Sequence, residues 1–409
     1  MPSALDGTPL VLMERPGQFS GLLEHPFDAY RRLRNADPVY AIPAAGGEDT
    51  EIYLVTGYEA ARQAHLHPDL SVERMKARVI RRYQHALPDM FVFPGGRKSI
   101  SSVDPPAHTR LRKIAIKAFT PRRVAQLQAS TVETARQLVK SFRRGTTFDL
   151  VKDFAEPFPA IVIAQLLGLP TEDRDEFRFH ASQVFVQMGQ TSPSAAMRSL
   201  SWLSDYLREH IAQRRTSRRD DVLSTLAANH EEGTLDEEEI LGMAILLLTA
   251  GHETTTNLIG SGFLHLFRFP EELDRLRRQP ELVEGAVEEL LRFDPPLQTN
   301  FRVATTDLEI DGAPVAKGGF VVIVIGAANR DPAQFSDPER LDIGREKNDH
   351  LTFGVGRHFC IGAALARMEG RVALRVLLDT FETMRPVTLS PARRPSLILR
   401  GPATLPVLV

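Results

Sequence analysis

The single cysteine of the chain, Cys360, lies in the segment HLTFGVGRHFCIG, in which three glycines alternate with bulky residues. Glycine permits tight turns and a close approach of the backbone to a large or flat group. Because a helix is expected directly after Cys360, free N–H groups and the helix dipole would favour the thiolate. A thiolate can be a nucleophile or a metal ligand, whereas a buried thiol can also be inert. A zinc site built from several cysteines is excluded, and the flanking phenylalanines suit packing better than acyl transfer.

A second chemical signal is the hexapeptide AGHETT, which begins at Ala250 within a strongly apolar segment. Ala250 and Gly251 lack side-chain bulk, so a flat ligand could lie against the backbone. Thr254 follows Ala250 by four residues, shares its helix face and can bond its carbonyl. Glu253 and Thr254 together place an acid and an alcohol inside an apolar helix, which suits proton delivery. The alternative is a helix kink with Glu253 in a surface ion pair, and His252 is expected to be structural.

Two further patterns could hold carboxylates or fix a loop. His108 and Arg112 form an H-x-x-x-R pattern, and arginine binds carboxylates in a fork geometry. A solvated basic helix face would show the same pattern. Glu289 and Arg292 share a helix face in VEELLRFDPP, but an E-x-x-R pair alone is common on surface helices.

The elements that must position these residues are mainly helical. Thr234 and Glu237 form a T-x-x-E capping box, which predicts a helix beginning at Thr234. No proline follows before Pro270, so about 34 helical residues would span about 50 Å. The middle of this helix is apolar nearly all round and is expected to be buried. The last helix is expected to run from just after Cys360 to about residue 381.

The rest of the chain adds shorter elements. We expect a strand hairpin over 38–42 and 52–55, a mostly helical region over 106–215, a helix over 280–293, a hairpin region comprising 308–310, 311–312 and 320–325, and long loops over 76–102 and 188–199. Regular βαβ alternation and a GxGxxG motif are absent from the sequence, which argues against a Rossmann fold. The sequence therefore predicts a mainly α protein with small β-sheets.

Composition limits the class of protein further. The chain has 409 residues, 43% hydrophobic and 25% charged, with a formal net charge of −2, so no nucleic-acid partner is expected. Residues 1–25 do not resemble a signal peptide, and the apolar run 243–251 is too short for a membrane anchor. One cysteine permits no internal disulfide, which fits a cytoplasmic setting. We expect one domain over 1–409, with residues 1–25 as an N-terminal extension.

The motif Phe353-Gly354-x-Gly356-x-His358-x-Cys360-x-Gly362 resembles the haem-binding signature of cytochrome P450, and the three other motifs agree with it and occur in the family's order. The resemblance covers about residues 26–409 and is closest to soluble bacterial enzymes that tailor macrolides and other natural products. It implies a cytochrome P450 fold with haem b buried between the long central helix and the Cys-loop helix. The implied roles are catalytic for Glu253 and Thr254; cofactor-binding for His108, Arg112, Ala250, Arg302, Phe353, His358, Cys360 and Gly362, with Cys360 on the iron; and structural for Glu289, Arg292 and Arg340.

By the same resemblance, a substrate pocket should lie above the haem, and its mostly apolar lining favours a lipophilic substrate. The implied pocket residues are Phe91, Phe93, Leu246, Thr249, Ala250, Gln298, Asn300, Ile398 and Leu399. The implied reaction is monooxygenation, either hydroxylation or epoxidation, with O₂ and electrons from an external ferredoxin and ferredoxin reductase. A basic patch of Arg110, Lys113, Lys117, Arg122 and Arg123 would suit an acidic ferredoxin, although ordinary surface charge is the alternative. Rival functions are an H₂O₂-driven peroxygenase and a non-catalytic haem-binding protein.

Overall fold

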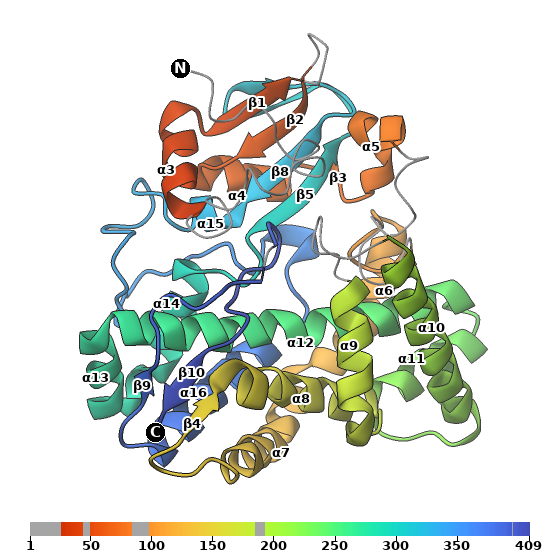
Figure 1. Ribbon diagram of the computed structural model, residues 1–409. Helices are drawn as coiled ribbons and strands as arrows, with labels where there is room; N and C mark the ends of the chain where they lie inside the picture. Colours follow the sequence, from red (N-terminus) through yellow and green to blue (C-terminus); the bar gives the residue numbers. More distant parts are fainter. Residues whose placement is uncertain (1–25, 44–49, 84–97, 185–192, 395) are drawn as a thin grey trace.

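The structure is a computed structural model that describes residues 26–43, 50–83, 98–184, 193–394 and 396–409. A strand-rich part lies at one end, and the larger helical part is crossed by the long helix α12 (Figure 1). The helices are α3 Pro26–Ala36, α4 Tyr58–Leu66, α5 Arg78–Tyr83, α6 Ala107–Ala115, α7 Pro121–Val139, α8 Pro157–Leu167, α9 Arg174–Val184, α10 Pro193–Thr216, α11 Val222–Glu231, α12 Glu237–Arg268, α13 Pro270–Arg278, α14 Val283–Phe293, α15 Ile325–Ala328 and α16 Ala363–Thr380.

Three small sheets accompany the helices in the part of the chain that the structure describes. Their strands are β1 Val39–Pro43, β2 Thr50–Val55, β3 Leu70–Ser71, β4 Thr147–Asp149, β5 Thr299–Ala304, β6 Leu308–Ile310, β7 Ala313–Val315, β8 Phe320–Val324, β9 Arg385–Pro386 and β10 Pro406–Leu408. The largest sheet has the order β1-β2-β8-β5-β3, in which β1 and β2 form the predicted antiparallel hairpin. The mainly α class with small sheets is therefore confirmed.

The predicted hairpin region over 308–325 is only partly correct. Strands β6 and β7 form a hairpin around Asp311 and Gly312, both of which have positive φ. Strand β8 does not join this hairpin, because it pairs in parallel with β2 and antiparallel with β5 in the large sheet. Its burial on the sheet explains its nearly continuous apolar sequence.

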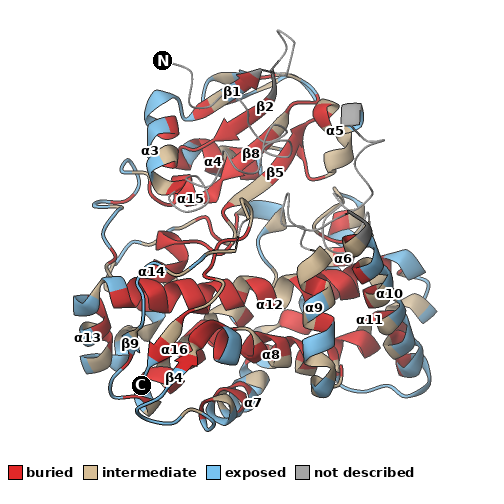
Figure 2. Ribbon diagram, in the orientation of Figure 1, coloured by how far each residue is buried: buried red, intermediate tan, exposed pale blue. Residues whose placement is uncertain are grey.

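Helix α12 is the long central helix, but its N-cap lies two residues later than expected. Asp236 is the N-cap, and it forms a reciprocal capping box with Glu239. Thr234 instead lies in the preceding turn, where its amide bonds the Asn229 carbonyl. At 1.5 Å per residue, its 32 residues span about 48 Å. Nearly all of α12 is buried, as expected from its apolar sequence (Figure 2).

The loop predicted over 188–199 is also shorter than expected. Helix α10 begins at Pro193, the position in a helix where proline is favoured, so residues 193–199 are helical. Within the loop predicted over 76–102, residues 78–83 form α5. Phe91 and Phe93 lie outside the described residues. None of the described helices is long and apolar enough to span a membrane.

Candidate functional site

A cavity of about 290 Å³ lies between the middle of α12 and the segment that leads into α16. Ala250, Gly251 and Thr254 line it from α12, whereas Cys360 and Gly362 line it from the opposite side. Two motifs that are about one hundred residues apart in the sequence therefore meet at one cavity. The rest of the lining is mainly aliphatic and aromatic, which suits a large apolar ligand.

The segment around Cys360 is held by backbone geometry. The Cys360 amide donates to the Phe353 carbonyl at 2.9 Å, which closes the loop onto itself. Gly354 and Gly356 have φ values of 65° and 76°, a region that favours glycine, so both glycines are required by the turn. The sulfur is exposed to the cavity, and α16 begins three residues later at Ala363.

The Cys360 thiol pKa lies above its ordinary value because burial disfavours the thiolate. The N–H groups of Gly362 and Ala363 and the charges of Arg112 and Arg367 lower this pKa, but burial has the larger effect. The helix terminus thus favours the thiolate, as expected, but its effect on the pKa is smaller than that of burial. A cation at the sulfur would supply the missing stabilisation.

The Cys segment is also clamped from outside by residues that sequence reasoning missed. Arg367 of α16 lies over the Phe353 ring, 4.5 Å from its centroid. The same guanidinium donates to both oxygens of Glu288 on α14, at 2.8 and 2.7 Å. Arg367 therefore connects α14, α16 and the loop around Cys360. Because Glu288 and Arg367 are far apart in the sequence, this contact could not be predicted without knowing how the two helices pack.

The α12 motif adopts the expected local geometry. The Thr254 hydroxyl donates to the Ala250 carbonyl at 3.0 Å, one turn back. Glu253 is buried, not at the surface as in the alternative interpretation, and burial raises its pKa to about 7. His252 is buried and donates from Nδ1 to the Leu248 carbonyl at 2.8 Å, as expected of a structural residue. Gly251 also makes room for Ile163, which would lie 2.8 Å from an added Cβ.

Basic groups gather around one end of the cavity. Arg112, Arg302 and His358 line it, and the buried His108 ring lies 4.1 Å from the His358 ring. His108 Nε2 and Arg302 Nη2 are buried and have no hydrogen-bond partner within the part of the chain that the structure describes. A buried unpaired donor is costly, so these two atoms fit an acidic ligand group.

Two further residues of this basic cluster were not foreseen. Arg74 lines the cavity, and burial together with nearby Arg302 holds its pKa well below the ordinary value. His65 is buried beside the Cys segment, and burial and Arg302 lower its pKa to about 3. Arg74 and Arg302 therefore place two positive charges at one cavity, which suits an anionic group on the ligand. The cavity, its thiol and its basic end together fit haem, an apolar ring with two carboxylates.

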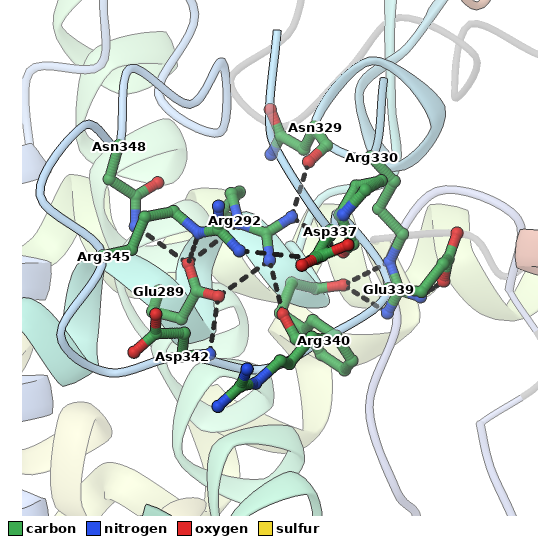
Figure 3. A network of polar contacts seen from close by, with 12 residues as sticks. Glu289, Arg292, Asn329, Arg330, Asp337, Glu339, Arg340, Asp342, Arg345 and Asn348 are labelled. Atoms are coloured by element: carbon green, nitrogen blue, oxygen red, sulfur yellow. Dashed lines mark hydrogen bonds and ion pairs between the residues drawn. The ribbon is translucent and has the colours of Figure 1, made fainter. Parts of the chain in front are cut away.

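The E-x-x-R pair forms the centre of a buried network (Figure 3). Glu289 and Arg292 are both 0% exposed and are joined by two bonds of 2.8 and 2.7 Å. The predicted third member, Arg340, is exposed and contributes only its backbone carbonyl to Arg292, at 3.2 Å. Arg345 takes its place, because its Nε donates to Glu289 at 3.1 Å. The identity of this arginine was therefore predicted wrongly.

The predicted substrate pocket is only partly assembled at the cavity. Leu246, Ala250 and Asn300 line it, whereas Thr249, Gln298, Ile398 and Leu399 do not. The Thr249 hydroxyl is turned back to the Ile245 carbonyl, and the Gln298 amide donates to Asp294 and the Pro295 carbonyl. Leu399 forms a bridge with Leu297, and Ile398 packs against the sheet core. Lining residues that were not foreseen include Val72, Ile100, Phe119, Leu291 and Leu297.

Another unforeseen residue at the cavity is Glu369 of α16, which is 0% exposed. Neither carboxyl oxygen has a well-formed hydrogen bond to a described residue, although Thr255 of α12 is close enough to lower the pKa slightly. Burial has the largest effect and raises the pKa well above its ordinary value, which favours the protonated form.

Comparison with known proteins agrees with this geometry. The family profile described as Cytochrome P450 matches residues 46–405. The chain is 38% identical to cytochrome P450 107B1 of Saccharopolyspora erythraea, covering 92% of this chain and 93% of that protein. It is 40% identical to the polyketide biosynthesis cytochrome P450 PksS of Bacillus subtilis, covering 74% and 76%.

The structure of the P450 monooxygenase TamI bound to tirandamycin C superposes with a TM-score of 0.85 at 36% identity, covering 95% of this chain and 98% of that one. The chain belongs to the cytochrome P450 family. It has the fold of that family, is a P450 monooxygenase, and uses the haem cofactor of the family.

Proposed function

We propose that this P450 hydroxylates or epoxidises a lipophilic small molecule in bacterial natural-product biosynthesis, with O₂ and electrons from an external ferredoxin and its reductase. The single observation that carries this proposal is the convergence of Cys360, Thr254 and the basic cluster on one mainly apolar cavity. The similarity to PksS, named for polyketide biosynthesis, and to TamI, bound to tirandamycin C, supports the substrate class. We also infer that residues 26–409 act as one domain.

Cys360 would bind the haem iron, and Arg112, Arg302, His108 and His358 would hold the propionates. When bound, the haem supplies a thiolate-ligated iron at which dioxygen is reduced. The Cys360 loop holds the sulfur through its amide bond to Phe353. Arginine forks and histidine N–H groups would bind the carboxylates by charge-assisted hydrogen bonds.

Thr254 and Glu253 would supply protons from the α12 side. The Thr254 hydroxyl donates to the Ala250 carbonyl, so its oxygen keeps lone pairs facing the cavity that it lines. Glu253 has a pKa of about 7, so it can both hold and release a proton near neutral pH. An acid of ordinary pKa would be ionised at this pH and would hold almost no proton.

The substrate would be mainly apolar and would carry a hydrogen-bond acceptor. Leu246, Leu247 and Ile163 give the cavity its apolar walls. The side-chain oxygen of Asn300 already accepts from the Phe301 backbone amide at 2.9 Å and from Arg302 at 3.3 Å. The side-chain amide nitrogen of Asn300 has no partner among the described residues and can donate to a carbonyl or hydroxyl of the substrate.

The redox partner would dock on the part of the basic patch that stays available. Arg110 is paired with Glu239, and Arg123 with Asp220. Lys113, Lys117 and Arg122 are exposed, and they would attract an acidic ferredoxin.

The decisive experiment is the CO-difference spectrum of the reduced protein beside that of Cys360→Ser. We expect a strongly red-shifted Soret band that the variant lacks. A band at the position typical of histidine-ligated haem, or absence of haem, would overturn the site assignment. Substrate turnover supported by ferredoxin and lost in Thr254→Ala would support the monooxygenase route, whereas turnover that needs peroxide and ignores Thr254 would support a peroxygenase.

A further inference from the structure

The Glu253 carboxyl lies close to a group of charged residues that do not bind it. Glu253 is buried, and its carboxyl has no hydrogen bond or ion pair to any residue that the structure describes. Arg394 lowers its pKa and Glu156 raises it, so both charges lie within electrostatic range. A buried carboxyl with an arginine nearby would ordinarily pair with it and stay ionised.

Glu156 accounts for the missing pair, because it binds both nearby arginines. One Glu156 oxygen accepts from Arg178 Nη1, and the other accepts from Arg394 Nη2. These residues belong to different elements: Glu156 precedes α8, Arg178 lies on α9, and Arg394 lies in the C-terminal loop. Each side chain is about one-fifth exposed, so the cluster sits between solvent and the buried acid.

The surroundings of Glu253 offer no other strong partner. Its neighbour His252 is held neutral, because burial lowers its pKa to about 4. The Thr256 hydroxyl donates to the carbonyl of Ala155, the residue before Glu156, at 2.9 Å, so the cluster lies beside this part of α12. Arg178 and Arg394 also lower the pKa of His252, in agreement with this placement. On the α16 side, Glu369 lies near Thr255, and burial raises its pKa well above the ordinary value. The arginines are therefore the only cations among the described residues whose charges reach this turn.

We propose that Glu156 is a positioning residue for Glu253: by binding Arg394 on one oxygen and Arg178 on the other, it keeps Arg394 from pairing with the Glu253 carboxyl, which can then take up and release a proton. The inference rests on the proposed role of Glu253 in proton delivery, but it concerns the state of the carboxyl and can be measured without turnover.

The test follows the Glu253 carboxyl stretch by infrared difference titration of the ferric, haem-loaded enzyme. The band is identified by its loss in Glu253→Gln. In Glu156→Gln, release of the arginines should lower the titration midpoint by about 1–3 pH units, the usual effect of an opposite charge within 4–6 Å. Arg394→Gln should shift the midpoint in the opposite direction, because Arg394 lowers the pKa in the native protein.

The double variant Glu156→Gln/Arg394→Gln separates positioning from a general loss of structure. Its midpoint should return toward the native value, whereas a merely loosened structure would not recover. Glu231→Gln, which breaks the exposed ion pair between Arg218 and Glu231 at the end of α11, is the matched control and should leave the midpoint unchanged. A shift below half a pH unit in Glu156→Gln, or a double variant that titrates like Glu156→Gln, would overturn the inference.

Product formed per electron consumed then tests the proposed function separately. If Glu253→Gln leaves this ratio and its pH profile unchanged, the role of Glu253 in proton delivery fails, and the titration still decides the inference about Glu156. If Glu253→Gln lowers the ratio, Glu156→Gln should move its pH profile toward lower pH, in step with the infrared midpoint.

Discussion

Replacement of Glu289 by alanine should strongly destabilise this P450. The Glu289 carboxylate binds Arg292 twice, Arg345 at 3.1 Å, Asn348 at 3.0 Å and the Asp342 amide at 3.0 Å. Its removal leaves Arg292 charged at 0% exposure. A charge without a partner in the interior is the main cost, and the orphaned donors add to it.

The expected loss is about 3–5 kcal/mol, the usual cost of removing one partner of a buried ion pair. Against a total stability of about 5–15 kcal/mol, this is a large fraction. Arg345→Ala should cost less, about 1.5–3 kcal/mol, because it removes one charged hydrogen bond and leaves the Arg292 pair intact. Arg340→Ala should change stability by less than about 0.5 kcal/mol, because its side chain is exposed and its carbonyl remains.

The assay is urea unfolding of the haem-loaded protein, followed in parallel by far-UV circular dichroism and by the Soret band. The order of midpoints should be wild type and Arg340→Ala highest, Arg345→Ala lower, and Glu289→Ala lowest. If Glu289→Ala does not accumulate as folded protein, the comparison of Arg345→Ala with Arg340→Ala still decides the issue. Equal destabilisation by these two variants would refute the assignment of Arg345 as the network partner.

Three further outcomes follow from buried charges. Arg302→Gln should retain less haem, since it removes a buried cation whose Nη2 faces the cavity unpaired among the described residues; the haem-to-protein absorbance ratio measures this. Burial alone would raise the pKa of Asp294, but Arg400 and the His265 hydrogen bond hold it below its usual range. Ionised Asp294 thus stabilises the folded state above the unfolded pKa of about 4, and this contribution is lost as the pH falls further. The free energy of unfolding of Asp294→Asn should therefore decrease less than that of wild type as the pH is lowered below about 4. Glu369 has a raised pKa, which penalises folding above about pH 4, so Glu369→Gln should be more stable than wild type at pH 8 but not at pH 4; a lower urea midpoint at pH 8 would contradict this.

Local sequence patterns predicted those parts of the site that depend on neighbours in the chain. The Thr254 bond to Ala250 follows from helical spacing alone, and the Cys360 loop follows from its glycines. Local patterns do not determine the start of α12, because Thr234 and Asp236 both have an acidic residue three positions later. Which of them caps the helix depends on the preceding turn, where the Thr234 amide is already bonded to Asn229.

Choices between distant partners could not be predicted in this way. Arg340 and Arg345 lie five residues apart in one irregular segment, and only its path around Glu289 decides which side chain turns inward. Gln298 was expected at the cavity, but its side-chain amide instead donates a hydrogen bond to the buried Asp294. In both cases the unmet hydrogen-bonding need of a buried group selected the partner, and sequence spacing does not encode that need.

Three buried glutamates illustrate how such partners, more than burial itself, set the chemistry of a carboxyl group. Glu289 is fully enclosed but is met by two arginines and an amide, so it serves as a fixed anion that holds a loop. Glu369 is equally enclosed and meets no cation, so burial raises its pKa well above the ordinary value and favours the protonated form. Glu253 lies between these extremes: burial raises its pKa to about 7, and Arg394, which is bound to Glu156, lowers it only in part. A carboxyl that must both hold and release protons requires this intermediate state, which neither a direct arginine partner nor complete isolation would provide.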